Sequence, residues 1–174
     1  MTTFIALLRS VNVGGNNKLP MASLQALCEK IGLQDVCTYI QSGNVVFRSP
    51  NAKLPATLQH EIEKVFHIRT PVILRTAEQL KAAVNNNPFP NVDPRKLIVS
   101  FLETEPAEVD IAAVRQMQIS PEEVRIIGTE MFIHFPDGQG KSKLPMARME
   151  RTLKTTSTGR NWNTVQALLK LANG

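Results

Sequence analysis

The sequence lacks the features that mark membrane-spanning and exported proteins. No apolar run approaches the roughly 20 residues that are needed to cross a bilayer. The opening residues, MTTFIALLRSV, place no basic segment ahead of their short apolar run, so they do not resemble a signal peptide. They are typical of a strand that begins a fold. We therefore expect a cytoplasmic protein that does not associate with a membrane.

Residues with catalytic or metal-binding chemistry are also scarce. The two cysteines, Cys28 and Cys37, do not form a CxxC motif, which favours two reduced, partly buried thiols over a redox or metal-binding pair. His60 and His67 lie in a helical segment among charged residues, and His134 belongs to a strand-like run. Neither an HxxxH motif nor a nucleophile elbow occurs. The sequence predicts no metal site, and it identifies no catalytic residue and no cofactor.

The basic residues are unevenly placed along a chain whose net charge is +5. Between Asp137 and Arg160 there are six basic residues and two acidic ones, and between Met1 and Lys18 there are two basic residues and no acid. A local excess of positive charge attracts anions such as phosphates or nucleic acid. The alternative is a solvated basic face without a partner.

Hydrophobic spacing in the first half predicts a β-α-β-β-α-β arrangement, which is ferredoxin-like. The helical pattern is clearest between Met21 and Ile31, where apolar residues recur every three or four positions and Gly32 follows as a stop. The predicted elements are strands over 2–9, 36–40, 45–47 and 71–74 and helices over 20–31, 54–67 and 76–84, the last capped by Thr76.

The second half predicts a smaller α+β part. The polar, proline-rich stretch 85–90 suggests a boundary, so we assign residues 1–87 to a ferredoxin-like subdomain and residues 88–174 to an α+β subdomain that ends in two helices. Its predicted elements are a strand over 96–102, a helix over 106–116, a hairpin centred on Gly128, a helix over 145–153, a turn over 155–159 and a helix over 161–171. On the helix over 106–116 we expect Val109, Ala112 and Ala113 to face inward.

Two stretches of similar sequence each join a strand to a helix. The first junction is VGGNNKLPM, Val13 to Met21, and the second junction is DGQGKSKLPM, Asp137 to Met146. Each has a glycine-containing polar loop followed by Lys-Leu-Pro-Met. Pro20 and Pro145 suit the first position of a helix, where no N–H is needed and φ is already fixed.

The free amides at these two helix starts need acceptors. Leu19 and Leu144 fall at the cap position, and leucine offers no side-chain acceptor. A loop side chain such as Asn12, Asn16 or Ser142 could fold back onto the amides, or water could reach them. An anion could also bind there, because open amides, a glycine-rich approach and adjacent lysines form a natural anion site.

Two further segments add polar groups. Gln41-Ser42-Gly43-Asn44 is a hairpin turn in which Gly43 supplies a positive φ, and its small and amide side chains could also contact a ligand. Asn161 is a good cap for the last helix, and Trp162 is expected to anchor that helix to the core. Arg160, just outside the helix, has a planar guanidinium that suits a phosphate or a carboxylate.

The predicted ligand-binding residues come from these four segments and from the end of the first strand. They are Arg9, Asn12, Gly14, Gly15, Lys18, Gln41, Ser42, Asn44, Lys141, Lys143, Arg160 and Asn161. A single composite site requires the four segments to be neighbours in the fold.

Four blocks of the sequence together resemble the bacterial domain-of-unknown-function family 1697. They are FIALLRSVNVGGNNKLPMASLQAL, TYIQSGNVVF, GQGKSKL and TGRNWNTVQALLKLA, and they extend over nearly the whole chain. The resemblance implies a two-part α+β fold with a ferredoxin-like first half, and it implies no activity. The family's recurrent positions correspond here to the predicted ligand residues except Lys141, together with Gly43 and Trp162. Family members often carry a small or polar residue at Pro145, so the second Lys-Leu-Pro-Met does not establish a duplication.

We interpret the sequence as that of a protein that binds a small anionic ligand, a nucleotide or a phosphorylated metabolite, at its basic glycine-rich loops. One alternative is nucleic-acid binding, but RNA-recognition modules of this topology use exposed aromatics, and the central strands offer only Phe4 and Phe47. Another is an enzyme acting on a phosphorylated or nucleotide substrate. Lys18, Gln41 and Arg160, with Ser42 and Lys143, would then stabilise charge, although no general base is identifiable.

Overall fold

The computed structural model describes all 174 residues and divides the chain into two compact units. Unit 1 comprises Met1–Lys81 together with Ala167–Gly174, and unit 2 comprises Ala82–Gln166. The chain leaves unit 1 within α3 (Ala77–Asn85) and returns to it within α6 (Trp162–Asn173). The division made from the sequence lies a few residues later and assigns the C-terminal end to the second part.

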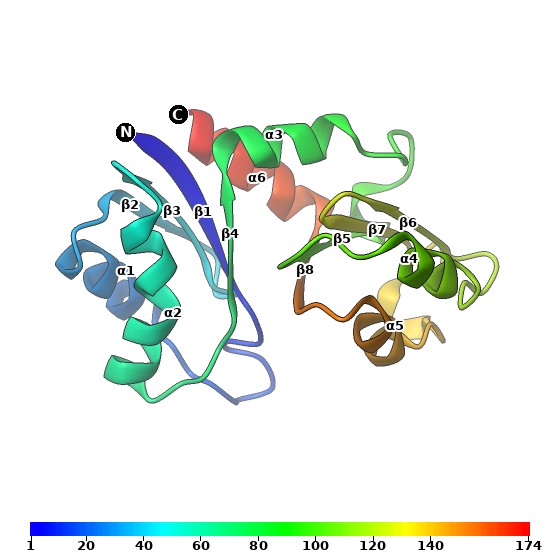
Figure 1. Cartoon of the computed structure of the whole chain (residues 1–174), viewed down its shortest axis with the longest axis horizontal. Helices are drawn as coiled ribbons and strands as arrows, with labels where there is room; N and C mark the ends of the chain where they lie inside the picture. The colour runs from blue at the N-terminus through cyan, green and yellow to red at the C-terminus, as the bar shows by residue number, and fades with distance from the viewer. The chain divides into compact units, whose positions relative to one another are not determined.

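Unit 1 contains a four-stranded antiparallel sheet with two helices on one face (Figure 1). Its strands β1 (Thr2–Leu8), β2 (Gln34–Tyr39), β3 (Asn44–Ser49) and β4 (Val72–Thr76) lie in the order β2-β3-β1-β4. The helices are α1 (Met21–Lys30) and α2 (Lys53–Phe66), which pack against each other. The predicted ferredoxin-like arrangement of the first half is therefore confirmed.

The core of unit 1 lies between this sheet and its two helices. Alternate residues of β1 face the helices, because successive side chains of a strand point to opposite sides. The fully or almost fully buried core residues include Phe4, Ala6, Leu8, Leu24, Phe47, Leu58 and Ile62. The rings of Phe4 and Phe47 stack with their centroids 5.9 Å apart. Both aromatics are thus committed to the core.

Local signals in the sequence explain where the elements of unit 1 end. Thr76 caps α3 as predicted, since its hydroxyl accepts a hydrogen bond from the Gln79 amide at 3.1 Å. The Gln79 side chain accepts one in return from the Thr76 amide at 2.8 Å, which completes a capping box. Gly32, the predicted stop of α1, has a φ of +101° that few other residues adopt.

Unit 2 has a second antiparallel sheet of four strands, in the order β6-β7-β5-β8. The elements are β5 (Leu97–Leu102), α4 (Glu108–Arg115), β6 (Glu123–Ile127), β7 (Glu130–His134), α5 (Met146–Leu153) and β8 (Ser157–Asn161), with short 3-10 turns at Pro94–Lys96 and Gln139–Lys141. Its core includes Ile111 and Val114 of α4, Ile133 of β7, and Met149 and Leu153 of α5.

The two units share one topology. In each, the order along the chain is β-α-β-β-α-β, and the second, third, first and fourth strands follow one another across the sheet. The two Lys-Leu-Pro-Met junctions nevertheless occupy different places in this plan. The first junction connects the first strand to the first helix of unit 1, whereas the second connects the third strand to the second helix of unit 2. The repeated tetrapeptide therefore does not mark equivalent positions of the two units.

Three predictions about local structure are wrong. Pro20 and Pro145 are the N-caps of α1 and α5, one residue before the first helical position, with ψ angles of 131° and 68°. The segment expected to be a turn over 155–159 contributes to β8, an edge strand that pairs with β5. On α4 the three residues expected to face inward, Val109, Ala112 and Ala113, are exposed, while Ile111 and Val114 belong to the unit 2 core.

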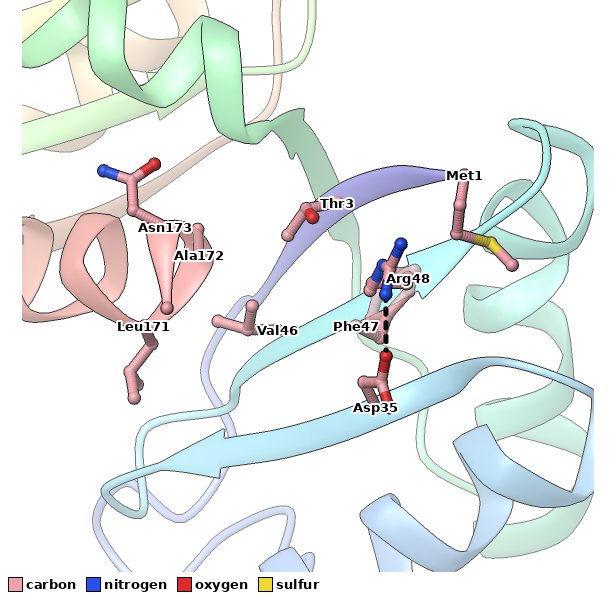
Figure 2. Close-up of a pocket in the computed structure, with 10 residues that line it drawn as sticks. Met1, Thr3, Asp35, Val46, Phe47, Arg48, Leu171, Ala172 and Asn173 are labelled. Atoms are coloured by element: carbon pink, nitrogen blue, oxygen red, sulfur yellow. Dashed lines mark hydrogen bonds and ion pairs between the residues drawn. The ribbon is translucent and has the colours of Figure 1, made fainter.

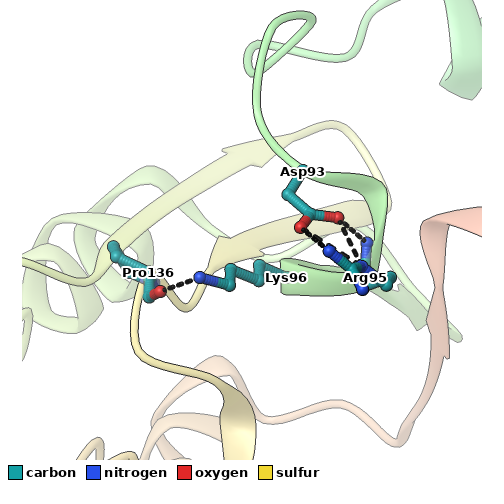
Figure 3. A network of polar contacts seen from close by, with 4 residues as sticks. All are labelled: Asp93, Arg95, Lys96 and Pro136. Carbon is teal, nitrogen blue, oxygen red and sulfur yellow. Dashed lines mark hydrogen bonds and ion pairs between the residues drawn. The ribbon is translucent and has the colours of Figure 1, made fainter.

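A polar network holds the start of β5 (Figure 3). The Asp93 carboxylate accepts a hydrogen bond from the Arg95 amide at 2.9 Å and forms an ion pair with the Arg95 guanidinium at 2.8 Å. These bonds to Arg95 lower the pKa of Asp93 from 3.8 to about 2. The ammonium of Lys96 donates to the Pro136 carbonyl at 2.6 Å, which ties β5 to the loop that begins the second junction.

Candidate anion-binding loops

Three loops of unit 1 meet at one end of its sheet. The Leu8 amide, at the end of β1, donates to the Gly43 carbonyl of the β2–β3 turn at 2.9 Å. The next amide, that of Arg9, donates to the Pro71 carbonyl before β4 at 3.0 Å. The Thr70 hydroxyl, in the same loop, donates to the Arg9 carbonyl. The segment that leads from β1 into the first junction therefore begins where the other two loops pass beside it.

Asn12 joins the first junction to the predicted turn. Its side-chain oxygen accepts from the Leu19 amide at 2.8 Å, and its side-chain nitrogen donates to the Leu19 carbonyl at 2.9 Å. The same nitrogen donates to the Gln41 carbonyl at 2.7 Å. Asn12 thus closes the loop between Val11 and Leu19 and fastens it to the turn, so the structure brings two of the four predicted segments together.

Gly43 is required in this arrangement for two reasons. Its φ of +81° lies in the region that side chains disfavour. A β-carbon at this position would lie 2.6 Å from a methyl of Val11 and 2.8 Å from the β-carbon of Leu8. The turn and the end of β1 therefore pack so closely that only glycine fits.

Backbone with positive φ is concentrated in these two loops. The residues are Ser10, Asn12, Gly14, Gly15, Asn17, Ile40 and Gly43. Ile40 is β-branched, which makes its φ of +49° the most strained of the set. Its side chain is half exposed, and so is that of Val13 at the tip of the first junction. Such strain persists only where surrounding contacts impose it, and it is common at functional sites.

The first junction leads into a helix start that no side chain caps. Pro20 occupies the N-cap and has no side-chain acceptor. Its carbonyl accepts from the amides of Ser23 and Leu24, but Met21 and Ala22 receive no side-chain acceptor. Lys18, two residues before the cap, is exposed and forms no ion pair. The positive end of α1 and this free ammonium therefore lie close together in the chain.

The second junction has a different construction, within unit 2. The Ser142 hydroxyl donates to the Glu122 carboxylate at 2.7 Å and accepts from the Leu144 amide at 3.1 Å. A loop side chain therefore folds back, as one of the alternatives anticipated, although it satisfies the amide of Leu144 and not one in the first helical turn. Lys141 and Lys143 are exposed on either side of Ser142 and form no ion pair.

Arg160 is buried, which differs from the accessible arginine that its place near a helix start suggested. It lies on β8 with 7% of its surface exposed, and its guanidinium donates to the Thr158 hydroxyl at 2.7 Å and the Gly159 carbonyl at 2.8 Å. Burial lowers the pKa of Arg160 to about 10, which still leaves it charged at neutral pH. In the sheet, β5 lies between β8 and the strand that leads into the second junction.

The two predicted asparagines at Asn44 and Asn161 have structural partners. Asn44 is fully buried, and its side-chain nitrogen donates to the Tyr39 carbonyl at 3.0 Å and the Ser42 hydroxyl at 2.9 Å. The Asn161 side-chain oxygen accepts from the Thr164 amide at 2.8 Å, which confirms it as the cap of α6. The accessible polar groups of the turn are accordingly those of Gln41 and Ser42.

A separate cavity of unit 1 has a single basic side chain in its lining, and this side chain is paired. Its volume is about 450 Å³, and β3 and the C-terminal residues of the chain contribute to its lining (Figure 2). Arg48 is the only basic side chain in the lining, and it pairs with Asp35 at 3.3 Å. The ion pair offsets the charge of this guanidinium, so Arg48 is not available as a free cation for an anionic ligand.

Redox and metal chemistry find little support in the arrangement of side chains. Burial raises the pKa of the Cys28 thiol to about 12, so this thiol is unreactive at neutral pH. Cys37 is exposed and unpaired. No three histidine, cysteine or acidic side chains gather where they could hold a metal ion. None of the helices has both the length and the apolar character that a membrane crossing requires.

The sequence of the chain matches a known protein family over most of its length. The model of the family described as a protein of unknown function, DUF1697, matches residues 1–132. The chain belongs to this family. The resemblance noted in the sequence is thereby confirmed, and the first two of its four blocks lie inside the matched range. The second junction and Arg160 lie beyond it.

A solved structure extends the likeness to the whole DUF1697 chain. It is that of a conserved bacterial protein from Streptococcus pneumoniae, which is 29% identical, with a TM-score of 0.73 over 98% of each chain. The α+β fold, including the second unit, is therefore shared with a known structure. No curated protein matches the sequence. Neither the family's description nor that of the streptococcal structure names a ligand or an activity.

Proposed function

We propose that this DUF1697 protein binds a small phosphate-bearing ligand, a nucleotide or a phosphorylated metabolite, at the first junction of unit 1. The observation that carries the proposal is the hydrogen bond between Asn12 and the Gln41 carbonyl, because it joins the first junction to the β2–β3 turn, and both contain predicted ligand residues. The ligand would contact the exposed surface of the two loops next to Lys18.

Three physical features support an anion at this place. The first turn of α1 has no side-chain cap, and a helix N-terminus favours negative charge. Lys18 has no acidic partner that would compete with a ligand. At Gly14 and Gly15 no heavy atom beyond the glycine and its two chain neighbours lies within 4 Å of the point where a β-carbon would stand, so a ligand can approach their backbone closely. Together these features supply backbone amides that can donate hydrogen bonds, a positive charge, and open space for a ligand.

The second junction has a role of its own in this function, apart from the site at the first junction. Lys141 and Lys143 present two free ammonium groups in unit 2. We propose that they contribute a second patch of positive potential that attracts the same class of anion. The guanidinium of Arg160 is buried and bonds to Thr158 and Gly159, so Arg160 is not included in the proposed site.

Nucleic-acid binding is less favoured than a small ligand. Phe4 and Phe47 are the aromatics of the central strands, and both are buried in the unit 1 core. They provide no platform on which bases could stack. An enzymatic role is less favoured because no general base is identifiable among the residues of the chain. The cytoplasmic location stays a prediction from the sequence.

A thermal-shift experiment tests the proposal. The melting temperature of the full chain is measured with and without inorganic phosphate, ADP and ATP. A ligand that binds only the folded protein raises it, and a concentration 100 times the Kd corresponds to about 2.7 kcal/mol of stabilisation. We expect a rise that falls as ionic strength increases, because the attraction is electrostatic.

Matched variants make this experiment specific to the first junction. Lys18→Gln is expected to reduce the ligand-dependent rise, while Lys30→Gln, an exposed lysine in the last turn of α1, is expected to leave it unchanged. An equal response from both variants would point to general attraction by the basic chain, and no rise with any of the three probes would contradict the proposal.

A further inference from the structure

Unit 2 contains a groove that the end of the second junction lines together with residues at the end of α4. It has a volume of about 550 Å³ and lies between the end of α4 and the start of α5. Ala113, Gln116, Met117 and Ile119 line one side. This volume is within the range of roughly 300–1,000 Å³ that small-molecule sites occupy.

The α4 side of the groove is apolar and open to solvent. Ile119 is 45% exposed, Met117 is half-buried, and Ala113 is exposed. The same face continues along the helix through Ala112 to Val109, whose side chain is 73% exposed. Met117 also packs against the unit 2 core, whereas Val109 and Ile119 are largely uncovered, and exposed apolar side chains on one face favour contact with an apolar group from outside.

The α5 side of the groove is basic. Lys143, Pro145 and Arg148 line it, and the lining contains no acidic residue. Both cations are exposed, and neither forms an ion pair. An apolar floor beside two unpaired cations is complementary to a molecule that has an anionic head and an apolar tail.

We infer that the groove between α4 and α5 binds a free amphipathic anion, with its carboxylate or phosphate head between Lys143 and Arg148 and its unbranched apolar tail along Met117 and Ile119. The inference does not depend on the phosphate site at the first junction, because that junction belongs to unit 1 and the groove belongs to unit 2; the groove shares only Lys143 with the second basic patch. The two can therefore fail separately.

The probe is sodium octanoate, titrated into the isotopically labelled full chain and followed by amide NMR. We expect the signals of Ala113, Met117, Ile119 and Lys143 to move, and those of the first junction to stay. Octanol lacks the charge and acetate lacks the tail, so each should bind at least about tenfold more weakly. Hexanoate should bind more weakly than octanoate by up to about fourfold for each methylene that is no longer buried.

Charge reversal tests the two cations. An exposed ion pair contributes up to about fivefold in affinity, and reversal replaces two attractions by two repulsions, so Lys143→Glu with Arg148→Glu should weaken octanoate binding by at least about tenfold. Lys30→Glu with Lys64→Glu makes the same change in net charge on exposed helical positions of unit 1 and should leave it unchanged.

Octanol binding as tightly as octanoate, signals moving only outside the groove, or unchanged affinity in the charge-reversed variant would each overturn the inference. Binding to phosphatidylglycerol vesicles without binding of free octanoate would also overturn it, because the surface would then recognise a membrane. If the charge-reversed variant does not fold, the comparison of octanoate, octanol and acetate on the natural chain decides alone.

Discussion

Substituting Asn12 by alanine should loosen the contact between the first junction and the β2–β3 turn. The substitution removes one acceptor and two donor interactions, at 2.8, 2.9 and 2.7 Å, which connect Asn12 to Leu19 and to Gln41. Each net hydrogen bond contributes about 1 kcal/mol. Because the side chain is half-buried, part of this free energy is recovered from water.

The expected loss of stability is therefore about 2–3 kcal/mol, from three such bonds with partial recovery. The backbone adds to it, because Asn12 has a φ of +56° and asparagine tolerates the left-handed region better than alanine does. Asn16 provides a control in the same loop. Its side chain is exposed and has no hydrogen-bond partner, so Asn16→Ala should change stability by under about 0.5 kcal/mol.

Two measurements follow the effect of Asn12→Ala. Urea denaturation monitored by far-ultraviolet circular dichroism gives the overall change, and hydrogen exchange of the Leu8 amide reports on unit 1, because that amide bonds to the adjoining turn. A loss of about 2–3 kcal/mol corresponds to about 30- to 150-fold faster exchange if opening controls it. Indistinguishable results for Asn12→Ala and Asn16→Ala would refute the bridging role.

Three other substitutions test separate features. Gly43→Ala should cost about 1–3 kcal/mol more than Gly15→Ala in urea denaturation, because both glycines have positive φ but only the first would place its β-carbon within 2.6 Å of another side chain; equal losses would argue against the close packing. Arg160→Ala should lower the melting temperature in plain buffer, since the buried guanidinium bonds to a hydroxyl and a carbonyl, each contact to a charged group contributing about 1.5–3 kcal/mol; an unchanged melting temperature would show that the arginine is dispensable for the fold. Arg95→Ala should return the pKa of Asp93 from about 2 toward 3.8 in an NMR titration. The ionised carboxylate stabilises the fold above about pH 4 and this contribution is lost as pH falls through about 2, so the variant should be less sensitive to acid in that interval.

Helices and strands whose apolar residues recur at a regular helical or strand spacing could be predicted from the sequence. The β-α-β-β-α-β order of unit 1 depends on apolar spacing and on local signals such as Thr76, and both are properties of neighbouring residues. The face of α4 could not be predicted in the same way. Its apolar residues include Val109, Ile111, Ala113 and Val114, which surround the helix and leave two faces of similar hydrophobicity.

Features that depend on distant contacts were not predictable. The segment over 155–159 is polar and contains glycine, and it becomes part of β8 only because β5 offers a free edge for pairing. The turn sequence predicts a positive φ at Gly43. It does not predict that Gly43 packs closely against Leu8, which only the folded structure shows. The sequence suggests Asn12 as a local cap, whereas its bond to Gln41 connects residues 29 positions apart. The burial of Arg160 has no signature in its neighbours.

The proposed phosphate site can be tested most directly by amide NMR of the labelled full chain during titration with inorganic phosphate and then with ADP. The account predicts that the signals of Gly14, Gly15, Lys18, Met21 and Ala22 move together and that they give a single Kd, because these residues form the open loop and the uncapped helix start. Signals that stay in place, or that move only elsewhere in the chain, would contradict it.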